Sequence, residues 1–180
     1  MTSAAATKTA SRHQGREVAL QVLYAIDLGG QAGMHRPPLD EAGDDEPTRA
    51  EASAEEGGAS VSGGPTVALG DRAFERVIEH FSVPGGALEF ARELVRGVVA
   101  ALPDLDALVS LHARNWRVAR MAVVDRNVLR IGAFELCKTD TPVAVVIDEG
   151  IDLARRFGSD SSPSFVNGVL DAIAKEVRSA

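Results

Sequence analysis

Apolar residues recur at three- and four-residue spacing along most of the chain, which is the period of an amphipathic helix. Runs of alternating β-branched residues bounded by turn signals, which would predict strands, do not occur. A first helix is expected over roughly 14–29, where Val18, Val22 and Ile26 mark an inner face and a Gly-Gly pair closes the helix. The sequence therefore predicts an all-α fold.

Six further helices are predicted from the same spacing and from proline, glycine and serine residues at the expected helix ends. The expected elements are about 72–82 with Asp71 as N-cap, 86–101, a helix from near Asp104, 123–138, Thr141 to Gly158, and a last helix that opens with Ser162 and Pro163. About seven helices of this size can enclose a core.

One segment interrupts the helical pattern. Residues 31–70 contain seven Gly and four Pro, and no aromatic residue. They also contain eight acidic and two basic residues, so they account for −6 of the formal net charge of −7. Such a segment cannot bury enough apolar surface to offset an ordering cost of about 1–2 kcal/mol per residue. We therefore predict a disordered acidic insertion at 31–70 within a single domain, together with a flexible tail at 1–11.

Composition and motif content exclude several classes of protein. One cysteine cannot form a disulfide framework, and the four histidines lack metal-ligand spacing, so neither a metal site nor a cofactor is expected. No apolar stretch approaches the ~18 residues of a membrane span, and no signal peptide is recognisable, so a cytoplasmic protein without membrane contact is expected. The carboxylates of Asp148, Glu149 and Asp152 precede Arg155 and Arg156 at helical spacing, as on a solvated, ion-paired face. Without nucleophile or phosphate-binding motifs, the chain is not predicted to be an enzyme.

A stripe on the first helix is the first candidate binding surface. Arg12, Arg16, Leu20 and Tyr24 recur every four residues and so form one ridge. Two guanidinium groups and an aromatic ring suit single-stranded RNA, because cations bind phosphates and a ring stacks on a splayed base. On spacing alone, a solvated helix edge with Tyr24 packed at its border is the favoured interpretation.

The start of the last helix offers a second candidate. Phe165 lies beside the core stripe of that helix, among serines in a first turn whose free backbone N–H groups favour a phosphate. Asn167, on the opposite flank, either reads a base edge or faces solvent. An ordinary Phe at the border of the core is the alternative.

A basic stretch around Trp116 is the third candidate. Its five arginines against one acid, Asp125, give a local charge of +4, which suggests nucleic acid. The arginines are Arg114, Arg117, Arg120, Arg126 and Arg130. The last two could instead support each other or pair with Glu89, Glu93 or Glu135. Asp125 could serve only as a favourable charge at a helix start.

Four motifs in this order resemble the family of the bacterial transcription antitermination factor NusB. They are "RHQGREVALQVLYAIDL", "FARELVRGVV", "NWRVARMAVVDRNVLRIGAFEL" and "TPVAVVIDEGIDLARRFGSDSSPSFVNGVLD". The resemblance covers residues 12–29 and about 86–177, and the insertion at 31–70 departs from the family pattern.

The resemblance implies a NusB-like bundle in two antiparallel helical subdomains. It also implies a non-catalytic function: such proteins pair with a small-subunit ribosomal protein, NusE, and the pair binds boxA RNA to make transcription processive, notably of ribosomal RNA operons. The transcription elongation complex and its other Nus factors are therefore expected partners. Whether the chain is a monomer or a homodimer stays open.

The resemblance also assigns site residues. RNA contacts are implied for Arg12, His13, Arg16, Tyr24, His112, Phe165 and Asn167, and contact with the ribosomal protein for Asp125 and Arg126. His13 and Gln14 stand where relatives often carry basic residues, which reduces the cationic contacts here.

Two alternatives have different functions. A ribosomal RNA cytosine-5 methyltransferase carries a NusB-like domain at its N-terminus, but 180 residues leave no room for its methyl-donor domain. The other alternative is a module that binds only a protein partner, which an RNA-binding assay would distinguish.

Overall fold

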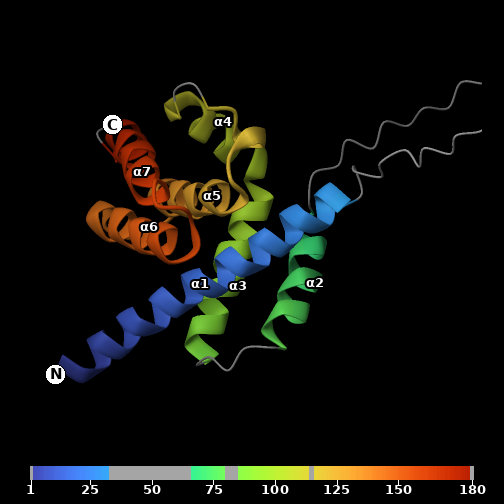
Figure 1. Cartoon of the computed structure of the whole chain (residues 1–180). Helices are drawn as coiled ribbons and strands as arrows, with labels where there is room; N and C mark the ends of the chain where they lie inside the picture. Colours follow the sequence, from blue (N-terminus) through green and yellow to red (C-terminus); the bar gives the residue numbers. More distant parts are fainter. Residues whose placement is uncertain (1, 33–65, 80–84, 114–115, 179–180) are drawn as a thin grey trace, which may run out of the picture.

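A computed structural model describes residues 2–32, 66–79, 85–113 and 116–178 (Figure 1). All regular structure in these ranges is helical, which confirms the predicted all-α class. The elements are α1 (Thr2–Ala32), α2 (Val67–Ile78), α3 (Gly85–Ala100), α4 (Leu102–His112), the 3-10 helix η1 (Val118–Arg120), α5 (Val123–Lys138), α6 (Val143–Phe157) and α7 (Ser162–Arg178).

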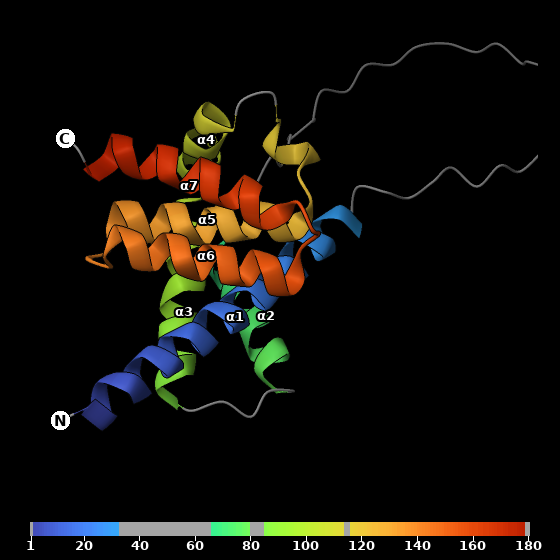
Figure 2. The same cartoon turned by 60° about the vertical axis from the view of Figure 1, so that its left-hand side comes forward.

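The helices form two groups that meet along α1 and α5. The long helix α1 crosses the molecule and packs with α2 and α3, while α4 to α7 form the second group (Figure 1). Within that group, α5, α6 and α7 lie side by side and run antiparallel, connected by short turns (Figure 2). Because α1 also contacts α5, the core is continuous between the two groups.

Two glycines allow α5, α6 and α7 to approach closely around Leu170. A Cβ at Gly132 of α5 would lie 2.6 Å from the Leu170 side chain, and one at Gly150 of α6 would lie 2.8 Å from it. Both distances are shorter than van der Waals contact, so a larger residue at either place would push α7 away. The close packing holds α7 against α5 and α6, and the turn between α6 and α7 carries part of the site described below.

The first helix is longer than predicted. It begins at Thr2 rather than near residue 14, so the expected flexible tail at 1–11 is helical from its second residue. The added turns include Ala4, Ala5 and Ala6, and alanine has the highest helix propensity. They show no apolar periodicity, which is why the hydrophobic pattern did not predict them.

The second helix also begins earlier than predicted. Thr66, and not Asp71, is the N-cap: its side chain accepts a hydrogen bond from the backbone N–H of Leu69. Residues 66–70 therefore belong to ordered structure, and the expected insertion at 31–70 is shortened at both ends. The prediction of disorder for the rest of that segment lies outside the described residues.

The remaining boundaries agree closely with the sequence. The helix predicted at 123–138 is confirmed as α5, and Pro142 and Gly158 are the caps of α6. Ser162 does not act as the N-cap of α7 that was predicted. Its hydroxyl instead accepts a hydrogen bond from the Ser159 N–H at 2.9 Å and so closes the turn before α7.

Candidate nucleic-acid interface

Arg16, expected on the surface of the first helix, is buried. Only 2% of the residue is exposed, and its Nε and Nη2 donate to the two carboxylate oxygens of Glu135 on α5 at 2.8 and 2.7 Å. Thr141 donates to the same carboxylate at 3.2 Å. A guanidinium enclosed in this way has no free face for a phosphate. The structure therefore corrects the placement of Arg16, which joins α1 to α5.

The expected ridge along α1 is broken for the same reason. Leu20 is buried, because α1 packs against α3 on one side and against α5 on another. The buried face of α1 is therefore wider than the spacing of its apolar residues indicated. Only Arg12 and Tyr24 of the four residues reach the surface. The Arg12 guanidinium lies 5.1 Å from the ring centroid of Phe90 on α3, at cation–π distance.

A second buried network joins the same two helices near the end of α1. Arg126 donates from Nε and Nη2 to Asp27 at 3.0 and 2.8 Å, and Arg130 donates to both Asp27 and Asp106. Burial lowers the pKa of Arg130, but its hydrogen bonds to the two carboxylates and their charges outweigh burial, so the pKa is raised. Arg126, expected to contact a protein partner, is instead buried and occupied within the fold. Arg114, from the same basic stretch, lies outside the described residues.

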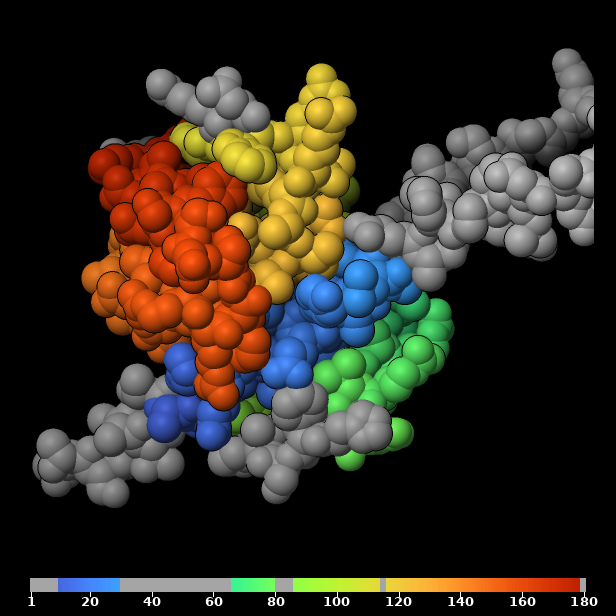
Figure 3. Space-filling view, in the orientation of Figure 1, coloured from blue at the N-terminus to red at the C-terminus, as the bar shows by residue number. Residues whose placement is uncertain are grey.

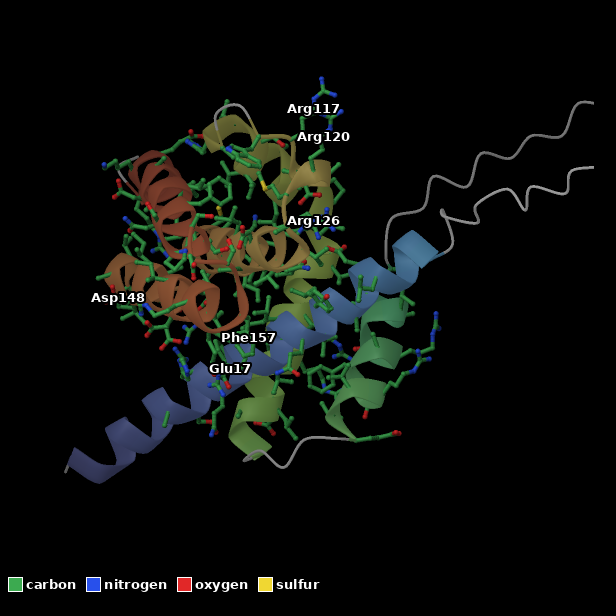
Figure 4. The ribbon with its side chains drawn as sticks, in the orientation of Figure 1. Glu17, Arg117, Arg120, Arg126, Asp148 and Phe157 are labelled. Carbon is green, nitrogen blue, oxygen red and sulfur yellow. The ribbon has the colours of Figure 1, made fainter. Side chains whose placement is uncertain are left out.

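His13 lies between two carboxylates. Its Nδ1 is 2.8 Å from Glu149 on α6, and its Nε2 is 3.3 Å from Glu17 one turn along α1. Arg156 also pairs with Glu17, which Figure 4 labels beside Phe157. Ion pairs thus partly cover this part of α1, and Arg12 beside them is exposed.

Tyr24 borders an apolar cavity of about 320 Å³ between α1, α5 and α6. The tyrosine is 39% exposed, and Leu20, Gln21, Val124 and Phe157 line the cavity with it. Aromatic rings from two helices therefore stand at its rim. A cavity with this lining can accept a flat apolar group such as a base.

Phe165 borders a second, smaller cavity of about 150 Å³, together with Trp116, Met121, Ala122, Asp125 and Ser161. The Trp116 and Phe165 rings are tilted by 53° with their centroids 5.7 Å apart, and Trp116 is 56% exposed. Asp125 is only 9% exposed, and its Oδ1 has no hydrogen-bond partner in the described structure. A buried carboxylate oxygen without a protein partner is uncommon in folded proteins.

The two cavities adjoin at the start of α5 and at the turn between α6 and α7. Val124 lines one cavity and Asp125 the other, while Phe157 and Ser161 stand at the two sides of the turn. In the space-filling view, the yellow segment of η1 and early α5 projects directly above the exposed blue end of α1 (Figure 3). Tyr24 and Phe165 thus line cavities that reach consecutive residues at the start of α5.

His112 and Asn167 lie apart from the two cavities. Nε2 of His112 is 2.8 Å from a carboxylate oxygen of Glu176 on α7, without the alignment of a hydrogen bond, and the residue lines neither cavity. Asn167 is exposed on α7 and lines neither cavity either.

Sequence reasoning did not assign Trp116 and Phe157 to these cavities. The basic stretch drew attention to Trp116, but its partner Phe165 is 49 residues away in sequence, a distance at which spacing carries no information. Phe157 is the last residue of α6, and no pattern in the sequence marked it as a surface aromatic.

The described part of the chain shows neither a metal cluster nor a membrane span. No group of three or more His, Cys, Asp or Glu side chains in it is arranged to hold a metal ion. None of its helices is both long and apolar enough to cross a membrane. A helical bundle whose distinguishing surface is a pair of aromatic cavities belongs to the class of helical interaction proteins.

Comparison with known proteins identifies the family. The NusB family model matches residues 69–175. The transcription antitermination protein NusB of a Nitratiruptor species is 33% identical over 169 residues, which cover 94% of this chain and 95% of that protein. Its counterpart in Anaeromyxobacter dehalogenans is 39% identical over 167 residues and 92% of each chain.

Solved structures agree. T. maritima NusB is similar with a TM-score of 0.65 and 28% identity, over 92% of this chain and 91% of that one. A chain in a crystal structure of the antitermination factors NusB and NusE in complex with dsRNA is similar with a TM-score of 0.64 and 26% identity, over 92% and 97%. The chain therefore belongs to the NusB family of transcription antitermination proteins, which are non-catalytic. The expectations of a NusB-like fold and of a protein that is not an enzyme are confirmed.

Proposed function

We propose that this protein binds single-stranded boxA RNA on the edge formed by Tyr24, Asp125 and Phe165, jointly with the ribosomal protein NusE. The observation that carries the RNA assignment is the pair of adjoining aromatic cavities at the start of α5. A structural relative is a NusB and NusE complex with dsRNA, which supports RNA and NusE as partners. With other Nus factors in the elongation complex, the bound pair would keep transcription of ribosomal RNA operons processive, in the cytoplasm.

The chemistry of the edge suits unpaired bases better than a duplex. Bases that are splayed out of a strand stack on aromatic side chains, and Tyr24, Trp116 and Phe165 present such rings. Asp125 lines the Phe165 cavity, and a carboxylate there can accept a hydrogen bond from the exocyclic amine of a base such as cytosine. Arg12 supplies a cation for the phosphates. His13, His112 and Asn167 stay predictions.

Single substitutions in the two cavities test the proposal. Tyr24→Ala and Phe165→Ala should each weaken boxA RNA binding by about 1–3 kcal/mol, the usual contribution of one stacked base. Val145→Ala is the matched control, because Val145 is an exposed apolar residue of α6 that lines neither cavity. Filter binding with and without NusE gives the affinities, and thermal unfolding checks the fold. Unchanged affinity in both folded variants would contradict the RNA assignment. If Phe165→Ala lowers the melting temperature and spares affinity, Phe165 is a core residue.

Asp125 has two candidate roles, as a base acceptor and as the predicted contact with NusE. Asp125→Asn removes the charge and keeps the size. If the carboxylate binds a base, affinity for RNA alone should fall. If it pairs with a cation of NusE, affinity for NusE should fall and that for RNA alone should stay. The position of Asp125 in one cavity with two aromatic rings favours the first role.

Self-association stays a prediction. Sedimentation of the protein alone and with NusE would show whether a homodimer forms and whether NusE displaces it.

A further inference from the structure

Two arginines at η1 have no ionic partner among the described residues. Arg117 precedes the 3-10 helix and Arg120 ends it, and the Arg120 N–H donates to the Arg117 carbonyl at 2.8 Å. A 3-10 helix has three residues per turn, so residues three apart lie on the same side. Both side chains are exposed, and Figure 4 shows them extending away from the body of the protein. No carboxylate of the described chain lies within ion-pair distance of either.

Beneath Arg117 lies the largest of the three cavities, of about 670 Å³, whose acids are already occupied. Asp27 is bound by Arg126 and Arg130, and Asp106 is held by two bonds from Arg130 at 2.7 and 2.8 Å. These pairs neutralise one another. Among the described residues, the positive charge of Arg117, and of Arg120 beside it, is therefore left without a carboxylate partner.

Trp116 connects this region with the aromatic edge. Its side chain lines both the Phe165 cavity and the cavity beneath Arg117. If a base of the RNA stacks on Trp116 and Phe165, the backbone of that RNA lies close to Arg117, because Arg117 directly follows Trp116 in the protein.

We propose that the RNA backbone continues from the aromatic edge across Trp116, and that Arg117 and Arg120 bind phosphates of nucleotides flanking the bases in the cavities. This inference rests on the proposed function and extends it to a sequence-independent contact. Guanidinium groups suit this role, because they donate in pairs to phosphate oxygens. NusE is the less suitable occupant: proteins that bind ribosomal RNA present basic surfaces, which two unpaired arginines would repel.

Two RNAs and two double variants test the inference. The short RNA is a boxA sequence alone, and the long RNA carries four extra uridines at each end. Arg117→Ala/Arg120→Ala is compared with Arg72→Ala/Arg76→Ala on α2. The control arginines are also exposed, and no ion pair of theirs is found in the described structure, so both variants change the net charge equally.

We expect the η1 variant to bind the long RNA roughly tenfold more weakly at 50 mM salt, with a salt slope lower by about 1.4, because each phosphate contact on a single strand contributes about 0.7. Its affinity for the short RNA and its melting temperature should match those of the wild type, and the α2 variant should bind both RNAs normally.

Three results would overturn the inference. Equal weakening by both double variants would show a general charge effect. If the η1 variant binds the long RNA with wild-type affinity, the two arginines do not contact the RNA. If the same variant also loses NusE binding, η1 is a contact with the protein partner. These outcomes leave the proposed function intact, whereas failure of the wild type to bind either RNA, with or without NusE, would remove both.

Discussion

Two groups of arginines in this protein differ in what faces them. At the junction of α1 and α5, Arg16, Arg126 and Arg130 are buried, and each is held by a carboxylate. At η1, Arg117 and Arg120 are exposed and have no such partner within the described ranges. The comparison shows that arginine content does not by itself define an RNA-binding surface. The presence or absence of a carboxylate opposite each guanidinium decides which arginines are left to pair with an external anion.

The difference predicts opposite consequences of substitution. Breaking a buried pair leaves one charge without water or a partner, so the cost appears in stability. Removing an exposed, unpaired arginine leaves nothing buried, so the cost appears only in binding to a polyanion.

The largest effect is expected from Glu135→Ala. It leaves the Arg16 guanidinium buried and unpaired, and should lower the free energy of unfolding by about 3–5 kcal/mol in urea denaturation. The control is Asp152→Ala, which breaks an exposed pair with Arg155 and should cost less than about 1 kcal/mol. Similar losses in the two variants would remove the distinction between buried and exposed pairs.

Asp27→Ala should be the next most harmful change. Asp27 accepts hydrogen bonds from Arg126, Arg130 and Asn127 but is less enclosed than Glu135. A loss of about 2–3 kcal/mol is expected, since bonds to charged groups are stronger than neutral ones. Urea unfolding measures it, and an unchanged midpoint would mean that water replaces Asp27 at little cost.

Arg12 and Arg16 sharpen the comparison within one helix, because they lie one turn apart. Arg12→Ala should reduce the salt slope of RNA binding by about 0.7, the share of one phosphate on a single strand. Its melting temperature should change little, because Arg12 is exposed and only its contact with the Phe90 ring is lost. Arg16→Ala should lower the melting temperature strongly. The reverse pattern would contradict the assignment of Arg12 to binding and Arg16 to the fold.

The smallest effect concerns an exposed pair between α2 and α3. The hydrogen bonds from Arg96 hold the pKa of Asp71 below its usual range. A lowered pKa means that the pair stabilises the fold above the pKa of Asp71 in the unfolded chain, and that this contribution is lost as the pH falls through the lower folded value. Arg96→Ala should raise the pKa of Asp71 toward 3.8, visible by NMR titration, with the unfolding midpoint at neutral pH nearly unchanged.

Helices with a clear apolar stripe or a proline or glycine at their ends were predictable. The sequence located α5 and, closely, the ends of α6, because proline and glycine at helix ends act locally. The alanine-rich start of α1 was missed, since a helix stabilised by propensity alone leaves no period in the sequence.

The candidate site was predictable only in part. Tyr24 and Phe165 were identified with the help of the family resemblance. The sequence did not reveal which arginines pair with carboxylates inside the fold and which are exposed. Glu89, Glu93 and Glu135 were the suggested partners of Arg126 and Arg130, whereas Asp27 and Asp106 are the actual ones. These pairs join residues up to 103 positions apart, and pairing over such separations depends on how α1 crosses α5.

The central claim is that RNA binds on the edge where the two aromatic cavities adjoin. Trp116 is the single tryptophan of the chain and lies there, half exposed beside Phe165, so its fluorescence reports on this edge alone. Titration with boxA RNA should quench it, with a midpoint equal to the dissociation constant from filter binding, because a stacked base changes the surroundings of the indole ring. RNA that binds in the filter assay and leaves Trp116 fluorescence unchanged would show that the interface lies elsewhere.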